Sequence, residues 1–325
     1  NYLLPITLNI VFNVVLLPKF GGTINLEYLS AVCKLCVAVS LVGLIFVCLG
    51  VSEYDKPENF RGLTAKKEPL KVKDMIAIVK ENKPLQCYIV AVASDKFAQQ
   101  TASQTVITTM LYGIIIGNMG LSSILSVIAM LPSIIFAVFG AKYAGKYGSK
   151  EAIVTWTKIC MAVGVISILF FVFGDASQIA TMFSPMMIGY VLITLLLNGA
   201  KMCVTTANTS FMADIIDYEL DRTGKYVPAV ITGTYSFLDK IITSFGALIA
   251  TGSIAIIGYT STVPQPGDAC TSGVFWLTIA LTYGLPMIGW ICTLAAMRFC
   301  HLNREEMVDV QKRIEEKKKA LASEN

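Results

Sequence analysis

The chain has 325 residues, of which 55% are hydrophobic and 15% charged, and its formal net charge at pH 7 is +4. Soluble domains carry about a quarter charged residues, so this composition argues against a soluble globular protein and favours the lipid bilayer as solvent. Most basic residues lie between apolar runs without interleaved aromatic residues, which argues against a nucleic-acid partner.

Eight apolar runs follow one another along the chain. They cover residues 2–17, 28–51, 85–116, 121–141, 153–173, 179–208, 227–259 and 273–300. A spanning helix needs about 20 apolar residues and satisfies its own backbone inside lipid. The sequence therefore predicts an all-α integral membrane protein with one helix per run. The first run is short and follows no initiator Met or basic leader, so we expect the chain to lack its N-terminal part.

Basic residues fall in alternate connections, while the other connections hold Lys19 and no further Lys or Arg. Since cytoplasmic loops carry the excess of positive charge, we expect the basic connections and the C-terminus in the cytoplasm. Two amphipathic segments belong to this side. Residues 71–82 are expected to form an interfacial linker helix. The tail after Leu302 has a stripe of Met307, Val310, Ile314 and Leu321 and is expected to form a solvated helix lying under the protein.

Three of the runs carry polar side chains at helical spacing. The stripes are Lys96, Gln100 and Gln104 with Asp95 and Gln99 beside them, then Asn198, Lys201, Thr205 and Asn208, and lastly a stripe through Lys240 with Asp239 beside it. Charges within apolar helices are costly unless they face protein or water. The stripes therefore predict a water-filled translocation pathway between helices. A polar seam that only joins the helices is the alternative.

The sequence shows no recognisable set of catalytic residues. The sequence has neither a GxSxG elbow nor a phosphate-binding glycine loop. Cys33 and Cys36 form a CxxC without a second pair, and His301 is the only histidine. We expect no catalytic activity, no metal site and no cofactor.

Residues 210–240 are predicted as a polar hinge between two apolar runs. Asp214 and Asp217 share a helical face near a helix end, and Arg222 follows them. This pattern predicts a charge lock of Asp214 and Asp217 with Arg222 or Lys225 at the cytoplasmic helix junction. Acid–base chemistry by the paired carboxylates is the alternative.

The hinge carries a family resemblance. Residues 212–219 read MADIIDYE, followed by Thr223-Gly-Lys225 and Phe237-x-x-Lys240. This pattern resembles the glycoside–pentoside–hexuronide:cation symporters of the major facilitator superfamily, which include melibiose permease. The family has twelve helices in two bundles, so the eight runs resemble helices five to twelve. The implied organisation is residues 1–51 as the end of the first bundle, 52–83 as the central loop, 84–302 as the second bundle and 303–325 as a charged tail.

The resemblance implies a function and roles for the polar side chains. The expected activity is symport of a sugar, glycoside or hexuronide with Na⁺ or H⁺. Lys240 matches the family's lysine near the sugar and cation sites, whereas Thr205 replaces an aromatic residue. Hydroxyl-binding roles are expected for Gln99, Gln100, Gln104, Asn198 and Thr205. Lys201 and Lys240 would hold a substrate carboxylate or else neutralise Asp95 and Asp239, with Lys96 contributing to the charge balance.

The same resemblance places the cation ligands mainly on helices that precede this chain. We expect a monomer in a bacterial cytoplasmic membrane. Three alternatives remain open: a lipid or amphiphile transporter of the same superfamily, a membrane enzyme acting on lipid-linked sugars, and a non-transporting interaction protein.

Overall fold

The computed structural model describes residues 4, 7–8, 11–20, 26–52, 72–224, 228–260 and 262–323, and these residues form helices without a strand. The chain divides into two compact units, residues 1–71 and 72–325. In the first unit, the π-helical turn η1 (Val11–Leu16) and the short α2 (Leu17–Lys19) precede α3 (Leu26–Val51). The Tyr28 hydroxyl of α3 donates a hydrogen bond of 3.5 Å to the Phe12 carbonyl.

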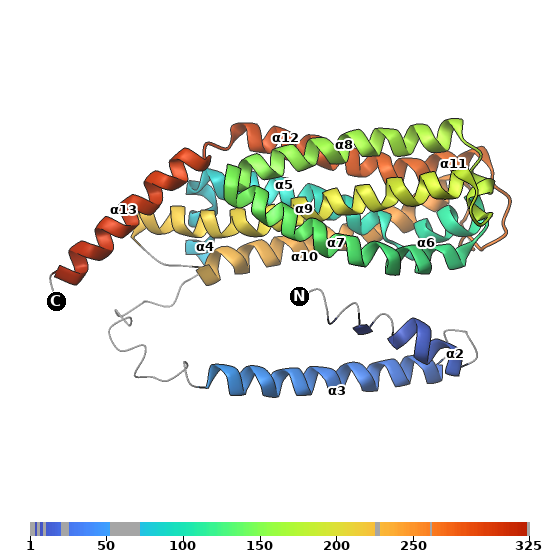
Figure 1. The fold of residues 1–325 in the computed structure, drawn as a ribbon, viewed down its shortest axis with the longest axis horizontal. Helices are drawn as coiled ribbons and strands as arrows, with labels where there is room; N and C mark the ends of the chain where they lie inside the picture. Colours follow the sequence, from blue (N-terminus) through green and yellow to red (C-terminus); the bar gives the residue numbers. More distant parts are fainter. Residues whose placement is uncertain are drawn as a thin grey trace. The chain divides into compact units, whose positions relative to one another are not determined.

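The second unit is a bundle of long helices with two flanking amphipathic helices (Figure 1). Its elements are α4 (Val72–Glu81), α5 (Lys83–Ala102), α6 (Thr105–Thr108), η3 (Thr109–Ile115), α7 (Met119–Tyr147), α8 (Ser149–Phe173), η4 (Ala176–Ala180), α9 (Pro185–Thr223), α10 (Pro228–Ile256), α11 (Ser272–Ile279), η5 (Ala280–Gly284), α12 (Leu285–Phe299) and α13 (Arg304–Ser323). η3 and η5 are π-helical.

Side-chain caps fix where these helices begin. The Asn82 side-chain oxygen accepts from the Leu85 amide at 2.9 Å and starts α5, and the Ser184 hydroxyl accepts from the Met187 amide at 3.0 Å and starts α9. Such caps satisfy amides that have no partner within the helix. Gly224 ends α9 in the left-handed conformation, with φ of 68°.

Small residues let the helices of the bundle approach closely. A Cβ atom on Gly140 of α7 would lie 2.8 Å from the Cα of Cys203 on α9, and one on Gly246 of α10 would lie 3.2 Å from the Thr101 amide of α5. Glycine contacts of this kind are typical of membrane helix pairs. Five described helices are long and apolar enough to cross a membrane: α3, α8, α9, α10 and the stretch Ser272–Phe299.

The prediction of one helix over residues 85–116 is wrong. α5 ends at Ala102 and α6 begins at Thr105, because Gln104 has an extended backbone with ψ of 141°. The Ser103 hydroxyl and the Gln104 side-chain amide each donate to the Gln100 carbonyl at 3.1 Å and cap the end of α5. Gln104 therefore does not continue the α5 stripe.

The prediction of a polar hinge over residues 210–240 is wrong in its first half. α9 runs unbroken through 39 residues to Thr223. A buried carboxylate, Glu219, is only 1% exposed near its end, so this polar stretch is packed helix and not a loop. Residues 225–227, which include Lys225 and Tyr226, lie outside the described residues.

Both amphipathic segments form the helices that the sequence predicts. α4 packs against α5 and α10, and α13 packs along α9. Of the predicted α13 stripe, Val310 and Ile314 are buried and Met307 is half-buried, while the Leu321 side chain lies outside what the structure describes. Burial of the stripe therefore docks α13 on the bundle.

Candidate functional site

Asp95 on α5 is a buried carboxylate in the middle of the predicted polar stripes, with 6% of its surface exposed. The Gln99 side-chain amide, one turn further along α5, donates to Asp95 Oδ2 at 2.7 Å. The indole N–H of Trp290 on α12 donates to Asp95 Oδ1 at 3.1 Å. Each carboxylate oxygen therefore accepts a hydrogen bond, as a buried acidic group requires.

A close backbone contact between α5 and α12 positions Asp95 and Trp290 beside each other. A Cβ atom on Gly289 would lie 2.9 Å from the Ser94 carbonyl oxygen. The Ser94 hydroxyl donates to the Gly289 carbonyl at 3.2 Å, and the Thr293 hydroxyl donates to the Ala91 carbonyl at 3.1 Å. Because Gly289 precedes Trp290, this approach holds the indole beside Asp95.

Lys201 joins the cluster from α9 through the same indole. Its ammonium nitrogen lies 5.8 Å from the centroid of the Trp290 ring, a cation–π contact. Asp95 and Lys201 interact electrostatically, yet no described carboxylate lies within salt-bridge distance of Lys201. Trp290 thus contacts Asp95 with its N–H edge and Lys201 with its face.

Asp239 is a second carboxylate inside the bundle, on α10. Its Oδ1 atom is buried and has no hydrogen-bond partner among the described residues. The neighbouring Tyr235 interacts electrostatically with both Asp239 and Asp95, and its ring packs 5.3 Å from that of Tyr88 on α5. The interface of α5 with α10 therefore carries two carboxylates and two phenols.

The remaining residues of the three predicted stripes are more scattered. Lys96, Gln100 and Lys240 are exposed, whereas Asn198 and Thr205 are half-buried. The Thr205 hydroxyl donates to the Lys201 carbonyl at 3.0 Å. The structure thus brings Asp95, Gln99 and Lys201 into one cluster and leaves the exposed members outside it.

At the end of α9, Arg222 has different partners from the ones that the sequence predicts. Arg222 donates to both oxygens of Glu219 at 3.0 and 3.1 Å, and also to Glu81 of α4 at 3.2 Å. The Asn82 side-chain amide donates to Glu219 at 2.9 Å. Glu219 therefore ties α9 to the junction of α4 and α5.

Asp214 and Asp217 do not pair with Arg222. Asp217 accepts from the Gln311 side chain of α13 at 2.7 Å. Asp214 lines a cavity of about 320 Å³ together with Ser149 and other residues of α7, α8 and α13. The two carboxylates and Arg222 thus occupy three separate contacts at this end of α9.

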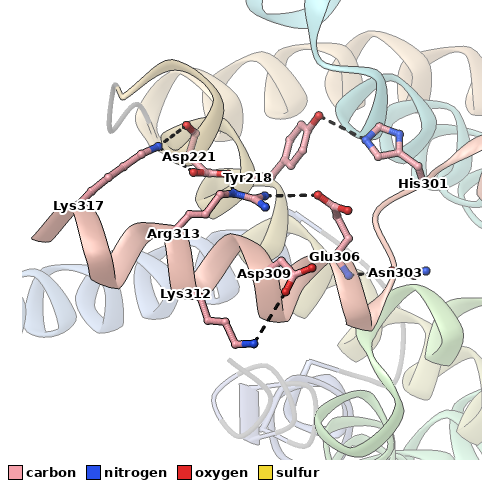
Figure 2. A network of polar contacts seen from close by, with 9 residues as sticks. All are labelled: Tyr218, Asp221, His301, Asn303, Glu306, Asp309, Lys312, Arg313 and Lys317. Atoms are coloured by element: carbon pink, nitrogen blue, oxygen red, sulfur yellow. Dashed lines mark hydrogen bonds and ion pairs between the residues drawn. The ribbon is translucent and has the colours of Figure 1, made fainter.

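A second ionic network clamps α13 onto the end of α9 (Figure 2). Asp221 accepts from Arg313 at 2.7 Å and from Lys317 at 2.8 Å. The hydrogen bond to Asp221 raises the pKa of the Arg313 guanidinium above its ordinary value. The Tyr218 hydroxyl lies 3.3 Å from His301 Nε2, with the two rings edge to face.

Sequence reasoning did not assign a role to Trp290, Glu81 or Asn82. Glu219 belongs to the 212–219 motif, but nothing in its local sequence marks it as buried. Among the described residues, no group of three or more His, Cys, Asp or Glu side chains is placed to hold a metal ion.

Comparison with known proteins identifies the family of the chain. A family model described as MFS/sugar transport protein matches residues 4–304. A search of curated proteins finds no match. The match covers nearly the whole bundle and the first unit, and the apolar helices agree with a membrane protein. The family consists of transporters and not of enzymes, and the chain belongs to it: it is a sugar transporter of the major facilitator superfamily.

Proposed function

We propose that the protein is a secondary active transporter that moves a sugar, glycoside or hexuronide together with Na⁺ or H⁺ by alternating access. Transporters of this kind rock two bundles around a central site. The proposal includes a monomeric protein in a bacterial cytoplasmic membrane, with its C-terminus in the cytoplasm. Family membership supports the solute class, and the polar groups inside the bundle support a central site.

The single observation that carries the proposal is that Lys201 lies inside the bundle without a direct ion pair to a described residue. A lysine inside an apolar bundle is expensive, and such residues mark solute or ion pathways. Lys201 contacts the Trp290 ring at 5.8 Å, which partly stabilises its charge. No described carboxylate neutralises it directly. The ammonium group therefore remains available for a solute oxygen or carboxylate.

The other candidate residues have complementary roles in this proposal. Gln99 uses one amide hydrogen on Asp95, which leaves its side-chain oxygen for a sugar hydroxyl. Gln100, Gln104, Asn198 and Thr205 supply further hydrogen-bonding groups, and Lys240 supplies a second cation. Asp95, Lys96 and Asp239 balance the charge. Asp214, Asp217 and Arg222 belong to the cytoplasmic gate, with Glu219 as the partner of Arg222.

The direct test reconstitutes the full-length transporter in proteoliposomes and measures uptake of labelled sugars, glycosides and uronides under imposed Na⁺ or H⁺ gradients. Accumulation of one of them that depends on one gradient identifies both solute and coupling ion. Absence of accumulation of every sugar by intact protein would contradict the proposal. A lipid panel would then test the alternative, transport of an amphiphile.

Lys240 offers a residue-level test of the same proposal. Lys240→Ala is expected to abolish uptake while leaving expression and thermal stability intact, because Lys240 is exposed and makes no ion pair with a described residue. Lys158→Ala, an exposed lysine on α8, is the matched control and is expected to transport like the wild type. Wild-type uptake by the Lys240 variant would remove this residue from the site.

A further inference from the structure

A second cavity lies beside the break between α5 and α6. Its volume is about 330 Å³, which is at the lower end for small-molecule pockets. Its polar lining consists of hydroxyl groups from Ser103, Thr108, Tyr112, Ser122 and Thr282, and the rest of the wall is apolar. It has no Asp, Glu, Lys or Arg in its lining, so the chemistry of this cavity is neutral.

The irregular backbone around the cavity indicates that the fold forms this cavity specifically. Broken helices inside a membrane are tolerated where they are buried in protein or line a water-filled cavity, and the break at Ser103 lies in the wall of this one. The π-helical segments η3 and η5 contribute Tyr112 and Thr282 to the same wall. π-helical turns interrupt a regular helix and are frequent at functional sites.

Two of the residues that line the cavity have hydroxyl groups with unused hydrogen-bonding capacity. The Tyr190 hydroxyl donates to the Tyr112 oxygen at 3.0 Å, which leaves the Tyr112 hydrogen free to be donated elsewhere. The Thr282 oxygen is buried and has no hydrogen-bond partner among the described residues. Buried polar atoms are normally satisfied, so an unpaired one in a cavity wall calls for a partner from outside the protein.

We propose that this cavity is a binding subsite for one neutral sugar ring, with Tyr112 and Thr282 hydrogen-bonding its hydroxyl groups. The subsite is distinct from the cluster of Asp95, Trp290 and Lys201, which carries charge. The choice of a sugar as its ligand rests on the proposed function. A glycoside would present an uncharged, hydroxyl-rich ring of the kind that this lining matches.

The test measures equilibrium binding and the concentration dependence of uptake for the labelled sugar panel with Thr282→Val and Tyr112→Phe. Each change removes one hydroxyl at nearly constant shape. Loss of one hydrogen bond predicts about a three- to tenfold weaker affinity or higher KM, with the maximal rate retained. Thr282→Ser keeps the hydroxyl and is expected to bind like the wild type.

Thr278→Val is the matched control, four residues earlier in the same stretch. The Thr278 hydroxyl donates to the Val274 carbonyl at 2.6 Å and does not line the cavity, so binding is expected to stay unchanged. A deoxy-sugar series adds a double-mutant cycle, since the sugar hydroxyl that meets Thr282 should matter in the wild type and not in Thr282→Val.

The outcomes separate this inference from the proposed function. Sugar binding that weakens in both variants, without gradient-driven accumulation, supports the subsite and overturns the symport proposal. Accumulation with wild-type binding and KM in Thr282→Val and Tyr112→Phe overturns the subsite and leaves symport standing. Absence of binding of every sugar in the panel overturns both.

Discussion

Helix α9 contributes to two charged clusters, and these differ in whether their charges are directly paired. Near its end, Glu219 is buried and accepts two hydrogen bonds from Arg222 in a direct ion pair. Further inside the bundle, Asp95 accepts from the N–H edge of Trp290 and Lys201 lies over the face of the same ring, without a direct ion pair between them. The first arrangement holds helices together, because every donor has an acceptor. The second leaves a cation with unused bonding capacity, as a binding site needs.

The largest effect is expected from removing the carboxylate of the fully paired cluster. Glu219→Ala removes the two hydrogen bonds that Arg222 donates to Glu219 and leaves the buried Asn82 amide without its acceptor. Breaking such a pair should lower the free energy of unfolding by about 3 kcal/mol. Thermal unfolding in detergent measures it.

Glu81→Ala is the control for that change, because Glu81 makes the exposed half of the same network, with 64% of its side chain accessible. Exposed ion pairs contribute at most about 1 kcal/mol. Equal destabilisation by the two variants would contradict the view that the buried carboxylate, and not the surface charge, holds this junction.

A smaller loss is expected from changing the indole that separates the charges of the inner cluster. Trp290→Phe keeps an aromatic ring beside Lys201 but removes the N–H that donates to Asp95. Hydrogen bonds to charged groups contribute about 1.5–3 kcal/mol. Trp276→Phe, on the exposed Trp276 of α11, is the control and should leave the thermal unfolding temperature unchanged. Equal loss in both variants would mean that the bond to Asp95 adds no stability.

The smallest effect is expected at the surface clamp between α13 and α9. Arg313→Ala removes one of the two cations on Asp221, while Lys317 remains bound. Burial of Val310 and Ile314 continues to dock the helix. Limited proteolysis of α13 should speed up by no more than about fivefold, and high salt should reduce the difference from the wild type. Release of α13 in this variant would show that the ion pairs and not the apolar stripe dock it.

The sequence predicts the helices and the polar residues of the inner cluster, but not every contact between helices. Hydrophobic runs and amphipathic spacing identify α8, α10 and α13 because these patterns are local. Asp95, Gln99 and Lys201 are recognisable as costly polar residues in apolar runs. That Trp290 joins them is not predictable, since the contact depends on Gly289 meeting the Ser94 carbonyl across two helices.

The errors have the same physical origin. Gln104 fits a helical stripe by spacing, yet side-chain caps on the Gln100 carbonyl end α5 before it. Asp214 and Asp217 look like partners of Arg222 by proximity in sequence, but Arg222 reaches Glu219 and Glu81 instead. Which carboxylate an arginine contacts depends on tertiary packing, and periodicity carries no information on that choice.

The most direct test of the contrast compares Lys201→Met with Lys158→Met, an exposed lysine on α8. Uptake of the transported sugar and thermal unfolding would be measured on the same reconstituted preparations. Lys201→Met removes the cation proposed to bind the solute and should reduce uptake at least about tenfold. Because Lys201 has no direct ion pair with a described residue, the thermal unfolding temperature of this variant should stay within about 3 °C of the wild type. Lys158→Met should match the wild type in both uptake and unfolding temperature. A Lys201 variant that is strongly destabilised but transports normally per folded molecule would contradict the account, because Lys201 would then be a structural cation like Arg222.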